Sequence, residues 1–121
     1  MYKIEGASVY YDSNLIFQVP GEIRYFVSYD DTLIVNYVIP VEDENLFSEE
    51  EIYRNVVCIN SSGEMIWRIQ QLPRSETLPF RPRFEAVGFE EDGALWAYDG
   101  GGWENLIDPE TGKILDREFT K

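Results

Sequence analysis

Apolar residues occur along this chain in short runs rich in Val, Ile, Tyr, Phe and Trp, and Asp, Asn, Gly and Ser separate the runs. The first group of residues favours strands and the second favours turns. In RYFVSY (24–29) and IVNYVI (34–39), one face of the predicted strand is apolar and the other is mixed. No helical periodicity persists for three turns, so the pattern predicts an all-β protein. We expect strands near residues 2–11, 15–19, 22–29, 33–39, 54–60, 64–70, 84–90, 94–99, 102–107 and 113–119.

These runs form a repeat. RYFVSYDDTLIVNY (24–37) and FEAVGFEEDGALWAY (84–98) both read as strand, acidic turn and strand, and both end on tyrosine. RNVVCINSSGEMIWRI (54–69) then corresponds to WENLIDPETGKILDREF (103–119). We therefore predict a single domain over residues 1–121 with repeat-like halves at about 22–70 and 84–119. Each half is a four-stranded antiparallel, blade-like meander, an N-terminal hairpin precedes them, and together they form a sandwich or an incomplete propeller.

The turn residues of the two halves support this alignment. Asn60 and Asp108 occupy equivalent positions, where either side chain can accept hydrogen bonds from the backbone just ahead. Gly63 and Gly112 can supply a positive φ at little steric cost. We therefore expect both glycines to lie in matching turns.

The two hairpins resemble the blade repeats of quinoprotein-type (PQQ-like) β-propellers, which show an apolar run, Asp, a turn with Thr-Gly-Lys, an apolar pair and Trp. The first copy matches at Ile59, Asn60, Gly63, Ile66 and Trp67. The second copy matches through LIDPETGKIL (106–115), with Asp116 in place of the tryptophan. The resemblance implies blade-like sheets. It covers about two blades, which are too few to close a ring of at least about four. We therefore carry over no quinone cofactor, and we predict no cofactor.

Only the first half carries an insertion between its second and third strands, at about residues 41–53. Within it, SEEEIYRN (48–55) reads as a short helix in which Ser48 and Glu51 form a capping box. Because the second half lacks this segment, we expect its carboxylates to be dispensable for closing the meander.

The formal net charge is −13, from 23 acidic and 10 basic residues. Such a field disfavours nucleic acid and anionic membranes, and it attracts basic proteins or simply keeps the chain soluble. No apolar run reaches the length of a membrane span, and the first residues do not resemble a signal peptide. A cytoplasmic location is the default expectation.

The chain has no histidine, which removes the commonest general base and every Ser-His or Cys-His pair. Its one cysteine, Cys58, lies in an apolar run, where we expect a buried and unreactive thiol. No spacing fits a zinc or calcium site, so we predict neither metal binding nor enzymatic activity.

The predicted partner-binding residues are the carboxylates of the insertion and one tryptophan. Trp103 follows three glycines and is expected to be exposed. The full set is Glu42, Asp43, Glu44, Glu49, Glu50, Glu51 and Trp103. The alternative is that the charged loop only solubilises the protein. Residues 72–84, LPRSETLPFRPRF, form the one locally basic segment, which could bind either a partner or the protein's own acidic surface.

These features favour a non-catalytic protein-binding domain, of the acidic immunity or inhibitor type that neutralises a basic partner. A structural module that pairs through its sheet edges, with itself or with another protein, is the second hypothesis. A carbohydrate or small-ligand binder that uses Trp96, Tyr98 and Trp103 is the third.

Overall fold

The computed structural model describes residues 1–74 and 78–120 and contains three antiparallel sheets and two short helices. The strands are β1 (Tyr2–Glu5), β2 (Ser8–Tyr11), β3 (Asn14–Gln18), β4 (Glu22–Tyr29), β5 (Thr32–Val38), β6 (Val56–Ile59), β7 (Met65–Arg68), β8 (Phe84–Phe89), β9 (Leu95–Asp99), β10 (Trp103–Ile107) and β11 (Ile114–Phe119). A 3₁₀ helix, η1 (Val41–Leu46), and a helix, α1 (Glu49–Tyr53), lie between β5 and β6. No helix in the described part of the chain is long and apolar enough to cross a membrane.

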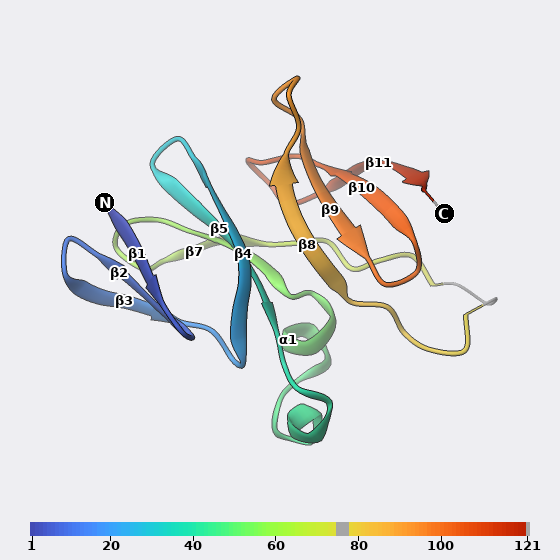
Figure 1. The fold of residues 1–121 in the computed structure, drawn as a ribbon, viewed down its shortest axis with the longest axis horizontal. Coiled ribbons are helices and arrows are strands. Elements are labelled where there is room, and N and C mark those ends of the chain that lie inside the picture. The colour runs from blue at the N-terminus through green and yellow to red at the C-terminus, as the bar shows by residue number, and fades with distance from the viewer. Residues whose placement is uncertain (75–77, 121) are drawn as a thin grey trace.

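The two predicted meanders are confirmed. The central sheet has the order β4-β5-β6-β7, and the C-terminal sheet has the order β8-β9-β10-β11. Figure 1 shows the three sheets side by side, from the blue N-terminal sheet through the cyan and green central sheet to the orange and red C-terminal sheet. The first strands of the two meanders, β4 and β8, are neighbours, and the rings of Tyr29 and Phe89 stack between them at 6.2 Å.

The N-terminal element differs from the predicted hairpin. The strand expected over residues 2–11 is two strands, β1 and β2, so the first sheet has three strands in the order β1-β2-β3. The chain reverses at Gly6, which takes a φ of 60°, and Glu5 pairs with Ser8 across the turn. The glycine permits this conformation without a steric penalty, although apolar residues continue on both sides of it.

The two inner strands of the central sheet, β5 and β6, are buried on both faces. One face packs with the N-terminal sheet and the insertion in a first core that includes Leu33, Val35 and Val57. The other face packs with the C-terminal sheet in a second core that includes Ile34 and Cys58. This corrects the expectation that residues 34–39 present one mixed face, because a strand covered on both sides has no solvent-facing side.

Two buried asparagines join the central sheet to β8. The Asn36 and Asn55 amide nitrogens donate to the Phe84 carbonyl at 3.2 and 2.8 Å. The Phe84 amide donates to the Asn55 side-chain oxygen at 3.0 Å. Asn55 therefore pairs with both backbone groups of Phe84 and fixes the point where the second meander begins.

The predicted matching turns are also confirmed, because Gly63 has a φ of 82° and Gly112 a φ of 77°. The Asn60 side-chain oxygen accepts from the Ser62 amide at 3.0 Å, and Asp108 accepts from Glu110 in the same way at 2.9 Å. The last strand of the preceding sheet also packs closely against each glycine. A Cβ on Gly63 would lie 2.1 Å from the Ile16 carbonyl oxygen, and a Cβ on Gly112 would lie 2.5 Å from the Trp67 ring.

Trp67 thereby joins the two meanders. Its indole nitrogen donates to the Pro109 carbonyl at 3.0 Å, and its side chain belongs to the second core. Asp116 stands at the equivalent position of β11, where it is exposed. The last strand of one sheet thus contacts a turn of the next sheet in two places, β3 at Gly63 and β7 at Gly112. The last strand of the C-terminal sheet, β11, has the exposed Asp116 where β7 has Trp67.

Cys58 is buried, with 1% of its surface exposed, which confirms the predicted core position. Burial raises the pKa of the thiol above its usual value, so little thiolate is present near neutral pH.

Candidate functional site

The insertion is part of the folded core. Ser48 and Glu51 form the predicted capping box, with the Glu51 amide donating to the Ser48 hydroxyl at 3.2 Å. Ile52 is buried in the first core, and the Tyr37 hydroxyl donates to the Glu51 carbonyl at 2.6 Å. The segment therefore contributes to packing, although the second meander closes without an equivalent.

The chain's own arginines engage three carboxylates of the insertion. Arg83 forms an ion pair with Glu44, and Arg81 pairs with Glu49 at 3.0 Å. Arg54 pairs with Glu50 at 2.9 Å. With Glu51 in the capping box, four of the six predicted partner-binding carboxylates already have a partner in the fold. Within residues 1–74 and 78–120, Glu42 and Asp43 are the two that form no such contact.

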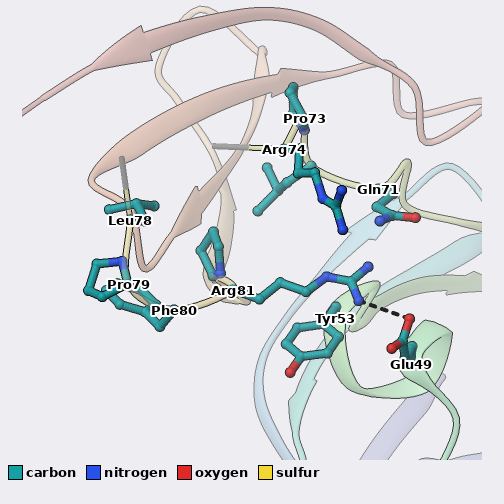
Figure 2. A pocket seen from close by; sticks show the side chains of 11 residues that line it. Glu49, Tyr53, Gln71, Pro73, Arg74, Leu78, Pro79, Phe80 and Arg81 are labelled. Atoms are coloured by element: carbon teal, nitrogen blue, oxygen red, sulfur yellow. Dashed lines mark hydrogen bonds and ion pairs between the residues drawn. The ribbon is translucent and has the colours of Figure 1, made fainter. Parts of the chain in front are cut away.

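Arg81 and Arg83 come from the segment that precedes β8, so this part of the basic loop binds the protein's own acidic surface. The Arg81 guanidinium lies over the Tyr53 ring, 4.2 Å from its centre, and reaches Glu49 beyond it (Figure 2). The loop and α1 border a cavity of about 470 Å³. Residues 75–77 of the predicted loop lie outside the described residues.

Trp103 is half-buried, which corrects the expectation that it is exposed. The Arg117 guanidinium lies over its ring at 4.6 Å, and the Phe119 ring lies 5.2 Å away. Arg117 also donates to Asn105 at 2.7 Å and to the buried carboxylate of Asp99 at 3.2 Å. The Trp103 ring is therefore already in contact with Arg117 and Phe119, and the buried carboxylate of Asp99 holds Arg117 in this position.

The opposite face of the C-terminal sheet has a different character. Trp96 and Tyr98 alternate along β9 with buried residues, so both rings point away from the second core. Glu104 on β10 pairs in register with Tyr98. The turn after β8 adds three more carboxylates, and part of this surface forms a shallow hollow of about 520 Å³ that is widely open to solvent. We name this surface the outer acidic face and define it as Glu90, Glu91, Asp92, Trp96, Tyr98 and Glu104.

The carboxylates of the outer acidic face form no salt bridge with any lysine or arginine in the described part of the chain. The Tyr98 hydroxyl donates to Glu90 at 3.4 Å. A hydrogen bond with Glu104, then burial and the charges of Glu104 and Glu90, raise the pKa of Tyr98 to about 12. This phenol thus lies beside two carboxylates that form no salt bridge within the described part of the chain.

The structure separates the three aromatic residues of the carbohydrate hypothesis. Trp96 and Tyr98 share the outer acidic face, and Trp103 lies with Arg117 on the other side of the sheet. Sequence reasoning noted Glu90, Glu91 and Asp92 as a turn but did not join them to Trp96 and Tyr98. The alternation of L-W-A-Y in β9 was the signal that could have joined them.

The chemistry of this surface is that of ionic and aromatic contact. Within residues 1–74 and 78–120, no group of three or more His, Cys, Asp and Glu side chains has a geometry that could hold a metal ion. The outer acidic face offers carboxylate acceptors beside an indole and a phenol ring, which together suit a cationic group.

Comparison with known proteins bears on the family and the fold. A family model described as a domain of unknown function, DUF7957, matches residues 2–119. No curated protein matches the chain. A similar solved structure is the crystal structure of the computationally designed Ika8 protein, with a TM-score of 0.58 and 11% sequence identity. The similarity covers 99% of this chain and 36% of the designed chain. At this identity the likeness concerns the fold alone.

Proposed function

The chain belongs to the DUF7957 family of domains of unknown function. From the geometry described above we propose that it is a non-catalytic domain that binds a basic protein. The outer acidic face is the binding surface. An inhibitor or immunity-type protein, which blocks a basic enzyme or toxin, is the role that this chemistry would serve.

One observation carries the proposal: the carboxylates of the outer acidic face have no cationic partner among the described residues, whereas those of the insertion have three. Opposite charges on two surfaces accelerate association and select the partner. Trp96 and Tyr98 supply large rings with few rotatable bonds, which suits them to a contact surface.

The insertion contributes to binding less directly than the outer acidic face. Glu42 and Asp43 add to the negative field, and Glu44, which pairs with the largely buried Arg83, helps to hold the insertion in the fold. We therefore place the direct contacts on the outer acidic face and assign the insertion to long-range attraction.

Two variants with the same net charge test this assignment. Glu90→Gln with Glu104→Gln removes two charges from the outer acidic face, and Glu42→Gln with Asp43→Asn removes two from the insertion. Lysozyme serves as the basic probe, and its affinity and association rate are measured at low and physiological salt. We expect the first variant to lose about tenfold in affinity and the second about twofold or less. Equal losses in both variants would mean that only net charge matters, and would overturn the proposed surface.

A structural or assembly module is the second candidate, favoured by the docking contact that occurs between successive sheets and stops at the C-terminal sheet. The chain also spans only about a third of the length of the designed protein whose fold it shares. Light scattering over a range of concentrations distinguishes the candidates, because an assembly module forms a defined oligomer. A monomer at all concentrations would exclude self-assembly.

A further inference from the structure

The protein holds two arginines between an aromatic ring and a carboxylate. Arg81 lies 4.2 Å from the centre of the Tyr53 ring and pairs with Glu49 at 3.0 Å. Arg117 lies 4.6 Å from the centre of the Trp103 ring and pairs with Asp99 at 3.2 Å. In both places the ring attracts the guanidinium face while the carboxylate accepts its N–H groups.

The outer acidic face contains the same two components without an arginine in the described part of the chain. Trp96 and the carboxylates of Glu90 and Glu104 line one hollow. The β8 residue opposite Trp96 is Gly88, and a Cβ built there would meet nothing within 4 Å. The space beside the indole on that strand is therefore open.

The carboxylates here also repel one another. Glu104 lies directly opposite Glu118 in the β10–β11 pair. Like charges in that position are unfavourable. Among the described residues, the hydrogen bonds to carboxylates of this face come from the Tyr98 hydroxyl to Glu90 and from the Ala94 amide to Asp92. A cation bound beside Glu104 would offset part of the negative charge that Glu104 and Glu118 bring together.

A guanidinium fits better than an ammonium or a metal ion. It is planar, so it can lie against Trp96, and its N–H groups can reach two carboxylates together. A lysine ammonium holds its water more strongly and gains less from the ring. The described residues also provide no group suited to a metal.

We propose that the hollow formed by Trp96, Glu90 and Glu104 is a binding site for an arginine side chain of the partner protein. The indole ring stacks on the guanidinium, and the two carboxylates accept its hydrogen bonds. The site rests on the proposed function, because it names the chemical group that the outer acidic face receives.

The test uses capped tetra-arginine and tetra-lysine peptides as probes, with binding measured by calorimetry. We expect the wild type to bind tetra-arginine about fivefold or more tightly than tetra-lysine, as an arginine–indole contact predicts. Trp96→Leu should abolish this preference, and Trp96→Phe should retain part of it. Glu90→Gln with Glu104→Gln should weaken both peptides about tenfold, against about twofold for the matched pair Glu42→Gln and Asp43→Asn. A thermal melt of each variant shows that it is folded.

The outcomes separate the two proposals. If both peptides bind the wild type equally and Trp96→Leu changes nothing, the arginine site is wrong, while a selective loss in the Glu90 and Glu104 variant still supports the acidic surface. If the two charge-matched variants lose affinity equally, both proposals are overturned.

Discussion

The insertion and the outer acidic face are both rich in carboxylates, but in the described part of the chain only the carboxylates of the insertion pair with arginines. Glu44, Glu49 and Glu50 each meet an arginine that follows later in the chain. Glu90 and Glu104 form no salt bridge among the described residues; the Tyr98 hydroxyl donates to Glu90, and both carboxylates raise the pKa of that phenol. A dense run of acidic residues is therefore not always available to a binding partner, because arginines from elsewhere in the chain can pair with it in the folded protein.

The two sets of carboxylates should therefore affect the stability of the native state in different ways. Carboxylates that are paired within the fold stabilise the native state, and removing one leaves a partly buried cation without its partner. Carboxylates that crowd together without cations destabilise it, and a binding partner can recover that free energy. The predicted substitutions therefore have opposite signs in the two regions.

The largest effect is expected for Arg83→Met. Arg83 pairs with Glu44 and donates to the Ile39 carbonyl at 2.6 Å, and its side chain is 18% exposed. Its loss leaves both acceptors unpaired, so we expect the free energy of unfolding to fall by about 2 kcal/mol. Urea denaturation measures it. Wild-type stability in this variant would show that the insertion is not held by the arginine and would remove the contrast between the regions.

Ser48→Ala should have a smaller effect in the same region. The hydroxyl accepts from the Glu51 amide and donates to the Glu51 carboxylate at 3.0 Å. Loss of this cap should lower the free energy of unfolding by about 1 kcal/mol. Asn45→Ala, an exposed change elsewhere in the insertion, serves as the control in the same denaturation experiment. An equal loss in both variants would mean that the cap itself contributes nothing.

The fold could largely be predicted because its determinants are local. Turn residues such as Gly63 and Gly112 and the run of β-branched residues in each strand set the hairpins without reference to distant parts of the chain. Gly6 carried an equally local signal that was missed, since the apolar pattern continues on both sides of it.

The site could be predicted only in part because its determinants are long-range. The burial of both faces of β5 depends on sheets that arrive from opposite ends of the sequence. The pairing of Glu49 with Arg81 joins residues 32 positions apart. No spacing rule states which acidic cluster a basic loop will reach, so the sequence could not distinguish the insertion from the outer acidic face.

On the outer acidic face the sign should reverse. Glu104→Gln removes the repulsion with Glu118 across the β10–β11 pair and should raise the free energy of unfolding by about 0.5 kcal/mol. Glu42→Gln is the control, and we expect it to change stability by less than this in urea denaturation. A lower stability for Glu104→Gln would show that the carboxylate is needed by the fold, and the surface would then resemble the insertion.

The smallest effect concerns the phenol of Tyr98. Glu104, the leading cause of the raised pKa, acts by a hydrogen bond and by its charge, so Glu104→Gln should lower the pKa from about 12 toward the ordinary value of 10. The stability that the protonated phenol contributes is fully present below the unfolded pKa of 10 and is lost as the pH rises through the folded value. Glu104→Gln should therefore show a smaller loss of stability between these two values than the wild type.

Absorbance at the tyrosinate band, followed through an alkaline titration, measures this pKa directly. Tyr2, Tyr29 and Tyr37 also have a raised pKa, mainly through burial, so the titration of Tyr98→Phe in each background is subtracted to isolate Tyr98. If Tyr98 titrates at the same pH with and without the Glu104 carboxylate, that carboxylate does not act on the phenol. The outer acidic face would then lack the crowding of charge that distinguishes it from the insertion, and an incoming arginine would relieve nothing there.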